Sequence, residues 1–368
     1  MTNGPPVNAL DVSVFRVPTE EPESDGTLTW SETTVVVVQI SAGNMRGLGF
    51  TYATPACAQL INDLLRTVVI GRDAFDIEGA WASMVRSIRN MGRPGIASMA
   101  IAAVDCALWD LKAKLFDVAL AVLLGRVRDE VPVYGSGGFT SLSNQQLEAQ
   151  LVHWVHDQAI PRVKIKIAEG WGSRVSRDLE RVRFARHVIG NECALYVDAN
   201  GGYSTKQAIR IAKELLESDV TWFEEPVSSD HLTSLAEIRS VVSIDVAAGE
   251  YGYDLFYFDA MCRATAVDCL QADVSRCAGI SEWMRVAVLA EVNGLQISGH
   301  CAQSLHAHPA CAINNLRHVE YFYDHARVDR LLFEGVLEPA GGVLRPDMTQ
   351  PGHGLVLKQA DAAQFRED

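Results

Sequence analysis

Three consecutive apolar stretches of the sequence end in a carboxylate at equal intervals. These acids are Asp198, Glu224 and Glu250, and each lies 26 residues from the next. A β-strand, a helix and two short loops occupy about 26 residues, which is one repeat of a parallel strand–helix–strand unit. The carboxyl ends of parallel strands open on the same edge of a sheet or barrel, so we predict that the three acids lie close together.

The same alternation continues through most of the chain. From residue 131 onward, strand-like runs alternate with amphipathic helical segments, and Asn293-Gly294 and a capping box at Ser204 and Gln207 mark helix ends. The expected strands cover residues 131–136, 163–167, 194–198, 221–224, 243–250, 267–273, 295–300 and 318–321. Strict alternation predicts a parallel sheet, and eight strands close into a barrel. We therefore predict an α/β fold with a barrel catalytic domain over residues 131–330.

The first 130 residues follow a different pattern and predict a separate α+β domain. Three β-branched runs predict a strand meander, and helical periodicity follows from about residue 55 to 125. The stretch Ile96–Leu115 is apolar almost all round, so we expect it to be buried between the domains, with Asp105 and Asp110 in salt bridges that pack the helix. Strand-like segments beyond residue 330 predict that residues 331–368 return to this first domain.

A polar segment, Thr19–Trp30, separates the first two expected strands. It is rich in acids and threonine, contains proline and glycine, and is longer than a hairpin turn requires. Loops of this kind often cover a functional site, although a surface loop without a function is the alternative. Trp30 at its end favours a segment that covers something, and we interpret it as a lid.

Composition narrows the class of protein. The net charge is −14 and no run is rich in lysine or arginine, which argues against binding to nucleic acid or to an anionic membrane. No apolar run reaches the ~18 residues of a membrane span and no signal-peptide pattern is present, so we expect a cytoplasmic protein. The eight cysteines include no Cys-x-x-Cys pair, which favours reduced, buried thiols over disulfides or a zinc site.

Three carboxylates at one strand edge repel one another. At about 4 Å and an effective dielectric constant near 20, each pair costs roughly 4 kcal/mol, so the cluster requires a cation. Ligands that are all oxygen favour a hard ion, Mg²⁺ before Ca²⁺ or Mn²⁺. The alternative is that each acid is a separate salt-bridge partner or helix cap, and the equal spacing of all three argues against it.

Basic residues end other strands of the expected barrel. Lys164 and Lys166 are two residues apart on the second strand, so both point to one face. Beside the acid Asp198, burial, Lys164 and the cation would push Lys166 toward its neutral, basic form. Asp273 and His300 end consecutive strands on the other side, where a carboxylate can orient an imidazole for proton transfer.

Together these residues resemble a known family. Lys-x-Lys on the second strand, acids on the third to sixth, histidine on the seventh and Glu320 on the eighth are similar to the enolase superfamily, specifically its mandelate racemase subgroup. Glu-Glu-Pro at 224–226 and Ala-Gly-Glu at 248–250 also match that family. The resemblance covers nearly the whole chain. It implies a modified (β/α)7β TIM barrel, an N-terminal α+β capping domain over residues 1–130, and a homo-oligomer that binds a small hydroxy acid or acid sugar.

The resemblance also implies a metal site. Asp198, Glu224 and Glu250 would ligate one Mg²⁺ per subunit, and Asn200 would lie just behind these ligands and bind substrate. Glu225 would point away from the metal, because adjacent strand residues face opposite sides.

The remaining residues receive roles in proton transfer and substrate binding. By resemblance, Lys166 would be the base on one face of the substrate, and His300, held by Asp273, the acid or base on the opposite face. Lys164 would neutralise the substrate carboxylate, and Glu320 would donate to it.

The implied reaction is removal of the proton α to a carboxylate, followed by loss of the β-hydroxyl of an acid sugar as water. The polar segment Thr19–Trp30 favours a hydroxyl-rich substrate over an aryl one. A racemase or epimerase is the alternative within the family. A zinc metallohydrolase barrel using His300, His306 and His308, and a binding protein without activity, are the alternatives from other classes. Cys301 is a candidate nucleophile, although nothing in the sequence activates it.

Overall fold

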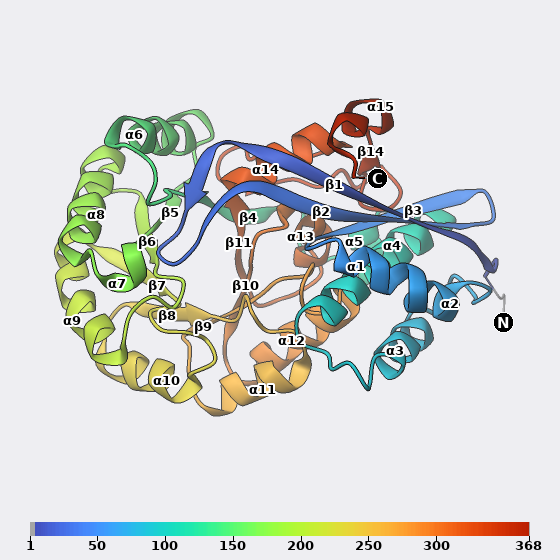
Figure 1. Cartoon of the computed structure of the whole chain (residues 1–368), viewed down its shortest axis with the longest axis horizontal. Helices are drawn as coiled ribbons and strands as arrows, with labels where there is room; N and C mark the ends of the chain where they lie inside the picture. The colour runs from blue at the N-terminus through green and yellow to red at the C-terminus, as the bar shows by residue number, and fades with distance from the viewer. Residues whose placement is uncertain (1–3, 368) are drawn as a thin grey trace.

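The computed structural model describes residues 4–367 and contains a closed parallel barrel (Figure 1). Each barrel strand is hydrogen-bonded in parallel to the next, and the last pairs with the first. The strands are β4 (Val131–Gly137), β5 (Arg162–Lys166), β6 (Ala194–Asp198), β7 (Val220–Glu224), β8 (Asp245–Ala248), β9 (Cys269–Ala272), β10 (Gln296–Gly299) and β11 (Leu316–Phe322). The predicted α/β barrel is confirmed, and the expected strand ends differ from these by at most two residues.

Helices cover the outside of the barrel. They are α6 (Asn144–Val152), α7 (Glu169–Gly172), α8 (Val175–Ile189), α9 (Thr205–Leu215), α10 (Leu232–Val241), α11 (Leu255–Arg263), α12 (Ile280–Val292), α13 (Gln303–Ala310) and α14 (Tyr323–Leu332). Each longer helix buries one stripe of side chains, as α9 does with Ala208, Ile211 and Leu215 at helical spacing. These buried stripes pack the helices against the barrel and so fix the positions of the strand ends.

The two predicted helix-end signals have different outcomes. Asn293 and Gly294 end α12 as expected, with Gly294 in the left-handed conformation at φ +71°. The prediction of a capping box at Ser204 is wrong, because the Ser204 side chain accepts no hydrogen bond from an N–H of the helix. Gln207 Nε2 donates instead to the Gly172 carbonyl at 2.6 Å. Gln207 ties α9 to the preceding loop.

Aromatic side chains fill the barrel below the strand tips. Tyr196 and Trp222 lie two residues before Asp198 and Glu224, so they share the inward face of their strands. Their rings stack at 5.3 Å, and Tyr134 and His318 complete a buried layer. Because this layer closes the interior, the charged side chains above it face only the carboxyl end of the barrel.

The N-terminal domain is an antiparallel sheet backed by helices. Its elements are β1 (Val7–Ser24), β2 (Thr29–Ala42), β3 (Met45–Tyr52), α1 (Ala56–Leu60), α2 (Arg66–Val69), α3 (Ile77–Ser87), α4 (Ile96–Leu115) and α5 (Leu120–Leu124). Helix α4 is buried against β2, β3 and α12, as expected for a helix between the domains. Asp110 pairs with Lys114 at 2.7 Å, but Asp105 accepts hydrogen bonds from the Ser281 N–H and hydroxyl and forms no salt bridge with any other residue of 4–367.

The prediction that Thr19–Trp30 is a loop is wrong. Strand β1 continues to Ser24 and β2 begins at Thr29, so only four residues form the turn of a long hairpin. A register shift between Pro18 and Glu23 accommodates the proline signals in the strand. The hairpin extends from the capping domain over the barrel (Figure 1), and the Thr140 N–H donates to the Ser24 carbonyl at 2.8 Å.

The last segment contacts both domains. Strand β13 (Val343–Leu344) pairs with β4 of the barrel, while β12 (Phe333–Glu334) pairs with β14 (Val356–Leu357). The His353 N–H then donates to Asp110 of α4 at 2.9 Å. Within residues 4–367, none of the helices combines the length and the apolar character that crossing a bilayer requires.

Candidate active site

The three equally spaced acids meet at the carboxyl end of the barrel. Asp198 and Glu224 are the last residues of β6 and β7, and Glu250 follows β8. Their carboxylate oxygens lie within 4.8 Å of one another, and all three side chains are buried. Apart from an ion-pair contact with His300, Glu250 Oε2 has no hydrogen-bond partner within residues 4–367. This set of buried oxygen ligands fits a hard divalent cation.

Gly249 lets Glu250 reach the cluster. Its φ is +132°, and a Cβ there would lie 2.0 Å from the Gln271 carbonyl oxygen. Only glycine combines this conformation with so close an approach to the neighbouring strand. The Ala-Gly-Glu sequence is therefore a backbone requirement for placing the third acid.

Lys164 and Lys166 point into the barrel from β5. Lys166 Nζ lies 2.5 Å from Asp198 Oδ2, and Lys164 Nζ contacts Glu224 and lies 2.7 Å from Glu320 Oε1. Burial is the largest influence and acts to lower the pKa of Lys166, but the attraction of Asp198, Glu250 and Glu320 together outweighs it and the net pKa is raised. The expected shift toward a neutral Lys166 depends on the cation as well, so it stays a prediction for the metal-bound site, in which Asp198 ligates the cation.

His300 lies across the barrel from Lys166. Its Nδ1 is 2.9 Å from Asp273 Oδ2, and its Nε2 is 3.3 Å from Glu250 Oε2. Burial acts to lower the pKa of His300, and the nearby Glu250 and Glu320 carboxylates reverse this and raise it. Asp273 holds the imidazole so that Nε2 faces the acid cluster.

Glu320, on β11, accepts hydrogen bonds on both oxygens. The Ser136 hydroxyl donates to Oε1 at 2.6 Å and the Cys301 N–H donates to Oε2 at 3.0 Å. Burial acts to raise its pKa, but Lys164 and His300 outweigh this and hold the pKa well below its usual range. An ionised Glu320 accepts hydrogen bonds only, so the donor role implied by resemblance requires it to take up a proton when substrate binds.

Sequence reasoning missed Arg276 and the contacts of Cys301. Arg276 is buried between Glu250 Oε1, at 3.4 Å, and Asp273 Oδ2, at 3.5 Å. An arginine three residues after the strand-end acid was the available signal. The sequence indicates Cys301 only as a candidate nucleophile. In the structure its Sγ lies 3.3 Å from both His300 Nε2 and Glu320 Oε2.

The three histidines of the zinc alternative do not converge. His306 Nε2 lies 3.2 Å from the His300 carbonyl oxygen, and His308 Nδ1 accepts the Ala121 N–H at 3.2 Å. Among residues 4–367, no group of metal-ligating atoms contains His306 or His308. One ring nitrogen of each contacts the backbone and the two side chains join no ligand group with His300, so the structure gives no support to a His300–His306–His308 zinc site.

A cavity of about 520 Å³ lies beside the acid cluster. Asn200 and Glu225 line it together with polar groups from three barrel loops and with Leu28 of the hairpin turn. Glu225 is outside the cluster of three acids, but it does not point to the opposite face of the sheet. Strand β7 ends at Glu224, and the left-handed conformation of Glu225, at φ +37°, keeps its side chain at the same end of the barrel.

The hairpin presents an aromatic side chain to the barrel. Trp30 packs edge-to-face on Phe139 at 5.5 Å, and Phe139 packs on Phe322. The acids Glu20 and Glu21 bond instead to Tyr323 and Gln146 outside the site. These two charges therefore give no support to a hydroxyl-rich substrate, whereas Thr27 of the same segment lines the cavity beside the acids.

Glu23 is the buried acid of the hairpin and makes a testable contribution to stability. Burial raises its pKa to about 8, and Trp30 Nε1 donates to it at 3.0 Å. Between pH 4.5 and pH 8 the Glu23 carboxyl group therefore keeps its proton in the folded state but loses it in the unfolded chain, where its pKa has the ordinary value of about 4.5. Because of this difference, Glu23 lowers the free energy of unfolding progressively as the pH rises toward 8. We expect Glu23→Gln to raise the melting temperature relative to the native chain, by an amount that grows between pH 5 and pH 8 and then levels off.

Melting curves at five pH values between 5 and 9 measure this difference. The exposed hairpin variant Glu21→Gln is the matched control and should follow the native chain. A constant difference between Glu23→Gln and the native chain across the range would refute the assigned protonation.

Comparison with known proteins agrees with the fold and the site. The fold and the site define a class of protein, the enolase-type barrel with a capping domain. The mandelate racemase / muconate lactonizing enzyme N-terminal domain model matches residues 9–125, and the enolase C-terminal domain-like model matches residues 146–362. The chain belongs to this mandelate racemase / muconate lactonizing enzyme family.

Three relatives illustrate the range of the family. The 3,6-anhydro-alpha-L-galactonate cycloisomerase of Streptomyces coelicolor is 31% identical over 95% of this chain and 97% of its own. A mandelate racemase/muconate lactonizing enzyme-like protein from Rubrobacter xylanophilus superposes with a TM-score of 0.95 at 45% identity, covering 99% and 100% of the two chains. The L-talarate/galactarate dehydratase from Salmonella typhimurium LT2, liganded with Mg and L-lyxarohydroxamate, gives a TM-score of 0.90 at 26% identity, covering 99% and 94%.

Proposed function

We propose that this protein removes the proton α to the carboxylate of an acid sugar and then expels the β-hydroxyl as water, giving a 2-keto-3-deoxy acid. The observation that carries the proposal is the placement of Lys166 and His300 on either side of the buried cluster of oxygen ligands. Two proton-transfer groups beside one cation site suit removal of a carbon-bound proton on one side and delivery of a proton on the other.

Asp198, Glu224 and Glu250 would hold one Mg²⁺ per subunit. The bound cation would supply stabilisation of the negative charge that develops on the substrate carboxylate when the α-proton leaves. Buried carboxyl groups outnumber the lysine and arginine side chains of the site, which favours a bound cation. The carboxyl groups are those of Asp198, Glu224, Glu225, Glu250, Asp273 and Glu320, and the basic side chains are those of Lys164, Lys166 and Arg276.

The side chains of the chain itself position the substrate and move protons. Lys164, between Glu224 and Glu320, would attract the substrate carboxylate, and Lys166 would take the α-proton once Asp198 no longer pairs with it. His300 would then protonate the departing hydroxyl from Nε2 while Asp273 keeps hold of Nδ1. Arg276 is a positioning residue, because it holds Asp273 and Glu250 in place.

The proposed substrate class rests on the relatives and on the cavity. Sugar acids stand in the names of both the cycloisomerase and the dehydratase relatives. The cavity beside the acids has hydroxyl and carboxylate groups in its wall, among them Ser228, Asp230 and Tyr257. These groups suit a polyhydroxylated chain better than an aryl ring.

The cycloisomerase relative supports a second candidate. Removal of the α-proton followed by expulsion of a ring oxygen opens the ring without losing any atom, so the product is an isomer of the substrate. The same residues would perform both reactions, and the position of the leaving oxygen would decide between them. A racemase is the third outcome, in which the proton returns to the α-carbon.

Mass spectrometry of the products separates these outcomes. The purified chain with Mg²⁺ is given a panel of mono- and diacid sugars, including L-talarate, galactarate and 3,6-anhydro-L-galactonate, and 2-keto products are trapped with a carbonyl reagent. We expect at least one substrate to lose the mass of water. An isomeric keto product would establish the cycloisomerase, and C2 inversion without a keto product would overturn both eliminations.

A further inference from the structure

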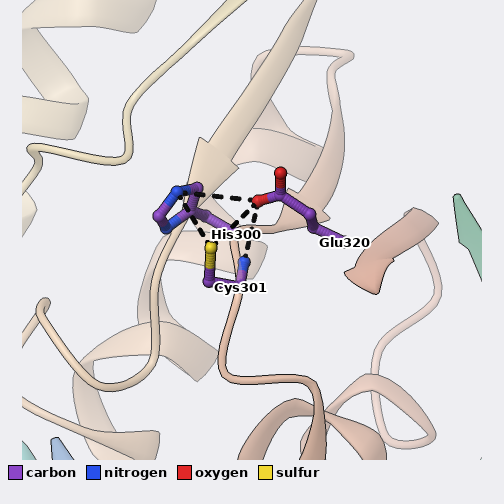
Figure 2. A group of neighbouring side chains, drawn as sticks. All are labelled: His300, Cys301 and Glu320. Carbon is purple, nitrogen blue, oxygen red and sulfur yellow. Dashed lines mark hydrogen bonds and ion pairs between the residues drawn. The ribbon is translucent and has the colours of Figure 1, made fainter. Parts of the chain in front are cut away.

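Three different ligand types converge beside the acid cluster. His300 Nε2, Cys301 Sγ and Glu320 Oε2 come from the end of β10 and from β11 and point toward one another (Figure 2). The sulfur lies 3.3 Å from both the nitrogen and the carboxylate oxygen, and these two atoms are 3.6 Å apart. All three side chains are buried.

The backbone is bent to bring the cysteine into this group. Successive side chains of a strand face opposite sides, so an extended chain would direct Cys301 away from His300. Instead Cys301 and Ala302 both adopt left-handed conformations, at φ +44° and +40°. Such residues cost of order 1–3 kcal/mol each and persist where the surrounding structure imposes them. The Cys301 N–H also donates to Glu320, which holds the carboxylate beside the sulfur.

The distances within this group match a tetrahedral metal site. Bonds of about 2.0–2.3 Å at tetrahedral angles place sulfur, nitrogen and oxygen ligands roughly 3.3–3.6 Å apart, which is the range found here. His300 Nδ1 is held by Asp273, as ligating histidines are commonly held by a carboxylate. The Asp198 cluster offers only oxygen, whereas this group offers sulfur, nitrogen and oxygen, so the two prefer different ions.

We propose that His300, Cys301 and Glu320 form a second metal site that binds a thiophilic divalent cation of the Zn²⁺ or Cd²⁺ class. Binding forms bonds from the metal to sulfur, nitrogen and oxygen, and releases the thiol proton and the Nε2 proton of any protonated His300 to solvent, with no change of oxidation state. The fourth coordination position is left for water or substrate.

Occupation of this site would inhibit the enzyme. This consequence rests on the proposed function, because a metal on Nε2 takes the lone pair through which His300 accepts and delivers protons. The binding itself does not depend on the reaction. It is therefore tested first, by a readout that needs no substrate.

The protein, saturated with Mg²⁺, is titrated with Cd²⁺ while near-ultraviolet absorbance is recorded. A thiolate bound to Cd²⁺ gives a charge-transfer band, and we expect one Cd²⁺ per chain with release of between one and two protons into an indicator-containing buffer, from the thiol and from the protonated fraction of His300. Loss of one direct ligand should cost more than the roughly 10- to 100-fold loss seen for groups that only hold ligands in place. Cys301→Ser should therefore bind Cd²⁺ at least about 100-fold more weakly.

Cys193→Ser is the matched control, since Cys193 is also buried but lies before β6, away from the group. It should keep the band. His300→Asn should lose affinity as well, which provides a second test if Cys301→Ser does not fold. No band in the native chain, or an equal band in Cys301→Ser, would overturn the proposal and leave only a thiol–carboxylate hydrogen bond. Inhibition by Zn²⁺ is then compared between Cys301→Ser and Cys193→Ser, each relative to its own zinc-free rate.

Discussion

Replacing Glu224 by glutamine should remove both divalent-cation binding and turnover. Glu224 is fully buried and contributes one of three carboxylates to the cluster at the barrel end. An amide keeps the shape of the side chain but removes the charge that attracts the cation. Because even groups that only support ligands are worth about 10- to 100-fold in metal affinity, we expect Mg²⁺ binding to weaken by more than about 100-fold. Calorimetric titration with Mg²⁺ and the product assay measure the two effects.

Asp105→Asn is a suitable control for this variant. Asp105 is equally buried but bonds to Ser281 at the contact between the domains, away from the cluster. It should bind Mg²⁺ like the native chain. If Glu224→Gln bound Mg²⁺ with unchanged affinity and kept its turnover, the cation would lie elsewhere and the assignment of all three acids would fail.

Lys166→Ala and His300→Asn should each stop proton exchange on a different face of the substrate. Lys166 lies on β5 and His300 follows β10, and around the closed ring two strands lie between β5 and β10 in one direction and four in the other. They therefore approach a substrate held between them from opposite sides. Loss of a general acid or base costs about 10²- to 10⁴-fold, so we expect each variant to lose turnover by a factor in this range.

Nuclear magnetic resonance in deuterated water distinguishes the two faces. Each variant is given both C2 epimers of a turned-over acid sugar, and incorporation of deuterium at C2 is followed. Lys166→Ala should lose exchange with one epimer and keep exchange with the other, and His300→Asn should show the reverse. Equal losses with both epimers in both variants would contradict the two-sided arrangement.

The hairpin shows where sequence reasoning fails. Proline, glycine and acids over Thr19–Trp30 indicate a loop when only neighbours in the sequence are considered. In the folded chain β2 supplies hydrogen-bond partners along β1, and a register shift after Pro18 absorbs the residues that do not fit. Cross-strand pairing overrides local turn signals, and no feature of the segment by itself reveals that it is paired.

The sequence also does not determine the ionisation states of the site residues, for a related reason. The sequence places Lys166 near an acid and a second lysine, which leaves the sign of its pKa shift to distances that are not written in it. In this structure Asp198, in contact at 2.5 Å, and the Glu250 and Glu320 carboxylates together outweigh burial and set that sign. In the same way, the sequence gives no sign that Cys301 faces His300, because strand alternation predicts that it points away and two left-handed residues reverse this.

The sequence by itself determined the barrel and the identity of its charged strand ends. Period-two and helical patterns, repeated with a spacing of 26 residues, leave few ways to bury the apolar faces, and parallel strands then bring Asp198, Glu224 and Glu250 to one end. Three features are visible only in the folded structure: the hairpin over the site, the contacts of Arg276 and Cys301, and the raised pKa of Glu23. These depend on distances and burial between segments far apart in the chain, and a one-dimensional pattern does not carry that information.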